Sequence, residues 1–169
     1  MTLQELANKE DALYSKVIDL YRQPQSQTTN EALRDIFHEY RKIHQAYAEL
    51  SLTDNEALKR GLFIQWYALS EPNYLTGIAD LDENAENKIV QVLNDRIESG
   101  NADNELIWML NYYANWDWIF ERLASFKGFN STIVNEQSNH LPEKIDRDEM
   151  AQRGQMGKYW NSLTKFSDA

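Results

Sequence analysis

Four ionisable residues fall on the otherwise apolar faces of predicted helices, where burial would change their chemistry. They are Glu10, His44, Arg96 and Asp117. A buried carboxylate needs a hydrogen-bond or charge partner, because removing it from water alone is very costly. Asp117 paired with His44 or Arg96 would meet that need. Such a pair either fixes the register of the helices or forms the polar floor of a pocket, where shifted pKa values accompany function.

The spacing of the histidines argues against a metal site. His38 and His44 are six residues apart, about 600° of helical rotation, so they face different directions. His140 falls in a polar, irregular segment. Di-iron bundles carry Glu-x-x-His motifs on two helices, and this motif does not occur in the chain. We therefore expect no transition metal and no other cofactor.

Motifs for covalent or phosphate chemistry are also missing. The chain has no cysteine, which excludes thiolate nucleophiles, disulfides and cysteine metal sites. It contains no Gly-x-Ser-x-Gly motif, and its six glycines never cluster as they do in a phosphate-binding loop. The sequence therefore predicts no catalytic residue.

The charge of the chain is strongly one-sided and restricts its partners. Its 169 residues carry 17 Lys and Arg against 27 Asp and Glu, a formal net charge of −10. A field of that sign repels phosphate backbones and anionic lipids, so we expect neither nucleic acid nor a membrane as partner. The N-terminal residues lack the pattern of a signal peptide, and no apolar run is long enough to span a bilayer. We expect a cytoplasmic protein.

Apolar residues recur at helical spacing through most of the chain, and 42% of its residues are hydrophobic. This pattern predicts an all-α fold, a single-domain bundle of five to six helices. Thr-x-x-Glu capping boxes at Thr2, Thr28 and Thr53 mark the first three helix starts. The expected helices span residues 3–21, 30–50, 53–70, 82–99, 103–126 and 144–165, with an irregular segment at about 127–143.

Two places interrupt this regular pattern. Pro72 ends the third helix, and the connection that follows should turn Tyr74 and Ile78 inward. Gly154 and Gly157 weaken the last helix, each by about 1 kcal/mol relative to alanine. They mark either a kink or close contact with a neighbouring element.

The tryptophan-rich segment LIWMLNYYANWDWIF, residues 106–120, is the most distinctive stretch of the chain. Its apolar side chains project into an arc about 200° wide, whereas a surface helix shows an apolar stripe nearer 100°. We therefore expect this helix to run through the middle of the fold. Trp118 falls on its polar side with Ile107 beside it, which is the composition of an interface anchor.

These features support two hypotheses of different classes. The first is a non-enzymatic interaction or regulatory protein that uses an acidic, aromatic surface, including Ile107 and Trp118, to bind another protein or a second copy of itself. The alternative is a small-molecule-binding protein or unorthodox enzyme with a pocket between the third and fifth helices. The residues predicted for that pocket are Trp66, Tyr67, Trp108, Tyr112 and Trp116 as walls, and His44, Arg96 and Asp117 as polar groups.

Overall fold

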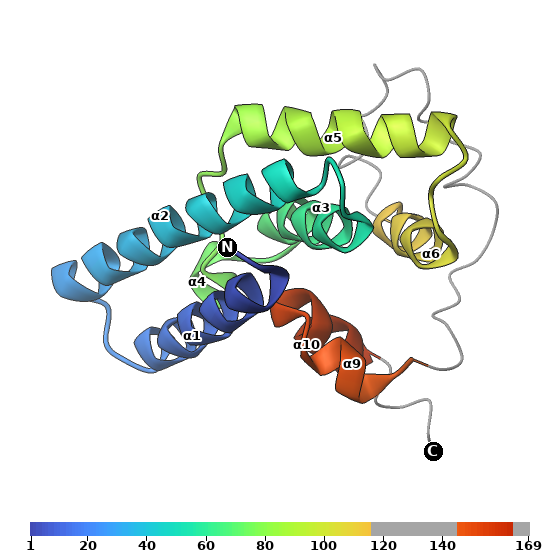
Figure 1. Ribbon diagram of the computed structural model, residues 1–169. Coiled ribbons are helices and arrows are strands. Elements are labelled where there is room, and N and C mark those ends of the chain that lie inside the picture. Colours follow the sequence, from blue (N-terminus) through green and yellow to red (C-terminus); the bar gives the residue numbers. More distant parts are fainter. Residues whose placement is uncertain (116–144, 164–169) are drawn as a thin grey trace.

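The computed structural model describes residues 1–115 and 145–163 (Figure 1). All regular elements in these residues are helices, which confirms the predicted all-α class. The described part of the chain forms eight helices rather than the expected five to six. They are α1 (Leu3–Tyr21), α2 (Gln27–Leu50), α3 (Asn55–Ser70), α4 (Asn73–Thr76), α5 (Glu83–Glu98), α6 (Asn104–Tyr113), α9 (Arg147–Ala151) and α10 (Gly154–Leu163).

Backbone geometry explains the additional elements. The connection after Pro72 contains the single-turn helix α4, which ends at Gly77 with φ at 75°. The last predicted helix is divided into α9 and α10, because Gly154 at their junction has φ at 62° and a continuous α-helix cannot contain that conformation. The tryptophan-rich helix was expected to reach residue 126. It ends at Tyr113 as α6, and residues 116–126 lie outside the described part.

Polar side chains fix the starts of the long helices. Thr2 and Glu5 form the predicted capping box of α1. The second helix starts three residues earlier than expected, since Ser26 and Thr29 form its box in place of the pair predicted at residues 28 and 31. Asp54, not the preceding threonine, caps α3 by accepting hydrogen bonds from the next helical N–H groups at 2.8 and 3.3 Å. A carboxylate is the stronger acceptor at the positive end of a helix.

The central element is α3, not the tryptophan-rich helix. Every residue of α3 from Ala57 to Trp66 is buried. Figure 1 shows α3 in the middle of the molecule, with α5 above it and α10 below it. Helices α2, α5 and α10 all pack against α3, and α1 packs against α2, α4 and α10. Within the described residues α6 is therefore not the central helix, although it is enclosed as expected, with no residue from Glu105 to Ala114 exposed.

Among the described helices, none combines the length and the apolar character needed to cross a lipid bilayer.

Candidate functional site

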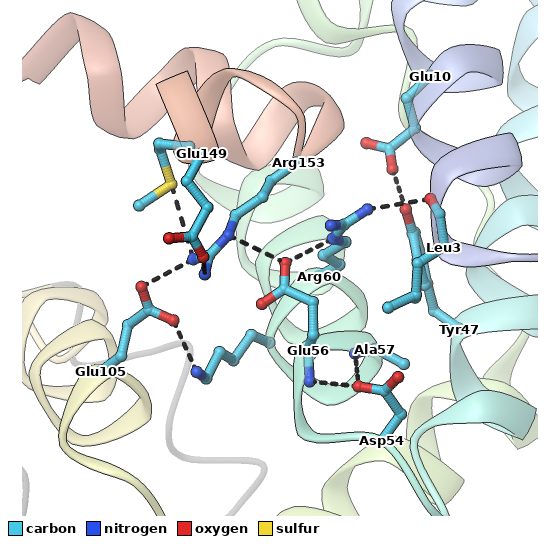
Figure 2. A network of polar contacts seen from close by, with 12 residues as sticks. Leu3, Glu10, Tyr47, Asp54, Glu56, Ala57, Arg60, Glu105, Glu149 and Arg153 are labelled. Carbon is cyan, nitrogen blue, oxygen red and sulfur yellow. Dashed lines mark hydrogen bonds and ion pairs between the residues drawn. The ribbon is translucent and has the colours of Figure 1, made fainter. Parts of the chain in front are cut away.

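The carboxyl of Glu10 on α1 is almost completely enclosed and is hydrogen-bonded by two other helices. Only 1% of Glu10 is exposed to solvent. Its carboxyl accepts a hydrogen bond of 2.5 Å from the Tyr47 hydroxyl on α2, which Figure 2 shows. It accepts a second bond of 3.1 Å from the backbone N–H of Gln155 on α10. The first two helices and the distant helix α10 therefore meet at this one side chain.

Two neighbouring side chains extend this arrangement. The Tyr40 hydroxyl donates to the backbone carbonyl of Glu10 at 3.2 Å. The side-chain amide of Gln155 donates to the Tyr40 hydroxyl and, at 2.7 Å, to the carbonyl of Thr76 on α4. We call Glu10, Tyr40, Tyr47 and Gln155 the Glu10 cluster. Its hydrogen bonds join α1, α2, α4 and α10.

Burial governs the charge of the Glu10 cluster. Desolvation raises the pKa of Glu10 to about 7, although the bonds from Tyr47 and Gln155 and the nearby charge of Arg60 favour the ionised form. A carboxyl with that pKa can gain or lose a proton near neutral pH. Substrate has no access to it, however, because the side chain is enclosed. What the cluster does in the structure is to hold α1, α2, α4 and α10 in position.

The backbone at Gly154 is shaped to fit against Glu10. A Cβ atom at this residue would lie 2.7 Å from the carboxyl carbon of Glu10. At Gly157, a Cβ would lie 1.7 Å from the carbonyl oxygen of Met150. Both glycines therefore permit approaches that a larger residue would prevent. The prediction that they mark a kink or a close contact is confirmed.

A network of ion pairs lies beside the Glu10 cluster and attaches the C-terminal helices to α3 (Figure 2). Arg60 contacts Glu56 at 2.7 Å and donates to the carbonyl of Leu3 at 3.1 Å. Arg153, between α9 and α10, contacts Glu56 at 3.3 Å and Glu105 of α6 at 2.7 Å. Charged side chains of α3, of α6 and of the junction between α9 and α10 thereby neutralise one another.

Lys59 continues this network toward α6. Its ammonium lies 2.8 Å from Asp103 and 2.6 Å from Glu105. Burial by itself would lower the pKa of Lys59, but the two carboxylates outweigh it and raise the pKa. Each of these cations thus lies against at least one carboxylate, with Glu56 and Glu105 each shared by two of them, and the network joins the helices structurally.

His44 is buried as predicted, and its predicted pairing with Asp117 falls outside the described residues. Neither ring nitrogen of this fully buried residue has a hydrogen-bond partner within the described ranges. Desolvation lowers the pKa of His44 to about 4, so the imidazole is neutral at neutral pH. Asp117, the partner that the sequence suggested, lies outside the described residues.

Replacing His44 should therefore change how stability depends on pH. In the unfolded chain this imidazole takes up a proton near pH 6.5, and in the folded protein only near pH 4. Falling pH thus favours unfolding between these values. We therefore compare the free energy of unfolding of His44→Leu with that of the wild type at two pH values. The difference, variant minus wild type, should be about 2 kcal/mol larger at pH 5 than at pH 8. Urea unfolding at both pH values measures this, and an equal effect at both would contradict it.

The predicted pocket walls on α3 and α6 lie in direct contact with one another. The Trp66 ring lies 5.9 Å from both Tyr67 and Tyr112. The hydroxyls of Tyr112 and Tyr159 are hydrogen-bonded at 2.7 Å. Where α3, α6 and α10 meet, these rings form an aromatic cluster of Phe63, Trp66, Tyr67, Trp108, Tyr112, Tyr113, Tyr159 and Trp160.

The remaining predicted site residues are separate from this aromatic cluster or outside the described part. Arg96 donates a hydrogen bond of 3.2 Å to the carbonyl of Leu52, in the connection between α2 and α3. Ile107 is half-buried on α6. Trp116, Asp117 and Trp118 lie outside the described residues.

An exposed pair of tyrosines was not predicted as a site. Tyr21, at the end of α1, and Tyr74, on α4, are 59% and 50% exposed. Their rings stack with centroids 6.0 Å apart and planes inclined by 13°. The expectation that Tyr74 points inward is wrong, because α4 has one turn and turns Thr76 to the interior instead.

The two tyrosines border a hollow of about 410 Å³, which we call the tyrosine hollow. It is lined by Leu20, Tyr21, Gln23, Gln25, Thr29, Asn30, Leu33 and Tyr74. A second hollow of about 350 Å³ lies between α1 and α2 and shares Leu20 and Gln23 with the first. We call it the acidic hollow; it is lined by Leu13, Lys16, Asp19, Leu20, Gln23, Ala32, Asp35, Ile36 and Glu39.

Comparison of the chain with protein-family models, curated proteins and solved structures finds no match. Within the described ranges, no group of three or more His, Asp or Glu side chains is arranged to hold a metal ion.

Proposed function

We propose that the protein is a non-enzymatic interaction protein that binds its partner at the tyrosine hollow. The observation that carries this proposal is the stacked pair Tyr21–Tyr74, half or more exposed at the rim of a hollow. Tyrosine supplies a large apolar face and a hydroxyl with few rotatable bonds, and it is enriched among the residues that dominate binding energy. A partner side chain seated in the hollow would bury both rings.

The interior supports a binding role rather than a catalytic one. Glu10 and His44, whose pKa values burial moves to about 7 and about 4, are both enclosed in the interior and out of reach of a substrate. The alternative, a ligand pocket between α3 and α6, is supported less, because its described walls Trp66, Tyr67 and Tyr112 pack against one another.

Substituting the two tyrosines should weaken partner binding strongly without affecting the fold. In the double variant Tyr21→Ser/Tyr74→Ser, we expect recovery of a specific partner from cell extract to fall at least about tenfold, the loss of one typical hot spot. Leu52→Ser is the matched control. Leu52 is 55% exposed at the opposite end of α2, about 35 Å away along the helix.

Quantitative mass spectrometry of proteins recovered by the wild type and the two variants provides the measurement. The proposal requires a partner that is lost with the tyrosine variant and retained with Leu52→Ser, while both variants keep the wild-type Tm. Equal recovery by the wild type and the tyrosine variant would contradict it, as would a partner whose recovery depends on Leu52 instead.

A further inference from the structure

We infer that the partner presents a basic segment with one aliphatic or aromatic anchor residue, an inference that rests on the proposed function. The anchor occupies the tyrosine hollow, and neighbouring Lys or Arg side chains lie over the acidic hollow. The two hollows are adjacent, because Leu20 and Gln23 line both of them. A single extended segment can therefore contact both at once.

The tyrosine hollow suits an apolar side chain attached to a polar backbone. Leu20, Leu33 and the two tyrosine rings provide apolar contact, while Gln25 and Asn30 add amide groups at the lining. Amides can donate to or accept from the backbone of a bound segment. No Asp, Glu, Lys or Arg lines this hollow. Its chemistry therefore selects an anchor by size and apolar character.

The acidic hollow has the opposite character and selects for charge. Its rim carries three carboxylates, those of Asp19, Asp35 and Glu39, against the single ammonium of Lys16. Asp35 forms no ion pair within the described part of the chain. Asp19 and Glu39 pair with Arg22 at 4.0 Å and Lys42 at 2.7 Å, but both pairs are exposed to solvent.

Exposed ion pairs of this kind are weak, so a partner's cations can replace or add to them. The net charge of −10 also attracts a basic partner from a greater distance. A second copy of this chain would bring a like charge to an acidic rim and is therefore disfavoured as the occupant. Nucleic acid and anionic lipid are disfavoured on the same ground. A basic protein segment is the occupant that the charges favour.

A display selection of random 15-residue peptides against the full-length protein tests the inference. We expect the selected peptides to be enriched in Lys and Arg and to share one aliphatic or aromatic position. Their binding should weaken at least about tenfold in the variant Asp19→Asn/Asp35→Asn/Glu39→Gln, since it loses three attractive charges. Raising the salt concentration from 0.05 to 0.5 M should weaken binding by wild type more than by this variant, because salt screens surface charges.

A variant with the same net charge provides the control. Glu83→Gln/Asp95→Asn/Glu98→Gln removes three exposed carboxylates from α5, which does not line either hollow. If only the number of charges mattered, both triple variants would bind equally weakly. If the acidic hollow is the site, the α5 variant should keep wild-type affinity within about twofold.

The outcomes separate this inference from the proposed function. Selected peptides that require Tyr21 and Tyr74 but show no preference for Lys or Arg would overturn the basic-segment inference and leave the proposed function standing. Selected peptides whose binding is unchanged by Tyr21→Ser/Tyr74→Ser would overturn both, as would a selection that yields no peptide dependent on the tyrosine hollow.

Discussion

Gly157→Ala is expected to destabilise the protein by about 3 kcal/mol or more, a typical cost of overpacking onto backbone atoms. The added Cβ would lie 1.7 Å from the carbonyl oxygen of Met150 and 2.8 Å from its carbonyl carbon. These atoms belong to the end of α9 and cannot rotate away as a side chain could. The junction of α9 and α10 would have to open, which would also displace Arg153 from its ion pairs.

This result would be opposite in sign to the effect of helix propensity. Gly157 lies inside α10, where alanine alone would stabilise an exposed helix by about 1 kcal/mol. Gly100→Ala is the matched control: its φ is 71°, but no atom lies within 4 Å of the added Cβ. It should lose only about 1 kcal/mol from the unfavourable backbone conformation. Urea unfolding measures both, and a Gly157→Ala protein as stable as the wild type would contradict the described junction.

Glu10 should make the protein less stable as pH rises from about 4.5 to about 7. Its folded-state pKa is about 7, raised by burial from an ordinary value of 4.5. Between these values the folded protein holds a proton that the unfolded chain has released. Raising the pH therefore favours unfolding, by about 3 kcal/mol in total once pH exceeds 7.

Comparison with Glu10→Gln isolates this contribution. The amide does not titrate, and its oxygen can accept from Gln155 while its NH₂ group faces the Tyr47 hydroxyl. The free energy of unfolding of wild type minus that of the variant should fall steadily from pH 4.5 to pH 8. His44 acts in the opposite direction between pH 4 and 6.5, so the wild-type curve alone would partly conceal the effect. A difference that is constant, or that grows with pH, would contradict the assignment.

The sequence predicted the helices well because a helix with one buried face has apolar residues at regular, helical spacing. It also placed Glu10 and His44 on buried faces. It could not provide their partners, since Glu10 is bonded by a hydroxyl on α2 and by a backbone N–H 145 residues further along the chain. Such contacts depend on how helices pack, which the periodicity of a single helix does not record.

The burial of α3 along most of its length was not predictable from its own sequence, for an electrostatic reason. Lys59 and Arg60 interrupt the apolar pattern of α3 and suggest a solvent-exposed side. In the structure both are buried, because Glu56, Asp103 and Glu105 supply counter-ions from neighbouring elements. An ion network of this kind lets a charged helix occupy an interior position, and the sequence pattern alone cannot reveal it.

The tyrosine hollow was missed because exposure at the end of a helix depends on what covers it. Tyr21 continues the apolar stripe of α1 and looks like a core residue by its spacing. At this end of α1 the ring of Tyr21 stacks on Tyr74 of the short helix α4 and stays 59% exposed. Where the apolar stripe of a helix extends past the helices that pack against it, apolar surface stays exposed and available for a partner.

Mapping a bound basic peptide by NMR on the ¹⁵N-labelled, full-length protein tests the binding account most directly. The account predicts that the largest chemical-shift changes fall on residues 13–39 of α1 and α2 and on residues 73–76 of α4, with His44 and the aromatic cluster little affected. Changes concentrated instead at Trp66, Trp108 and Tyr112 would contradict it and favour a ligand site between α3 and α6.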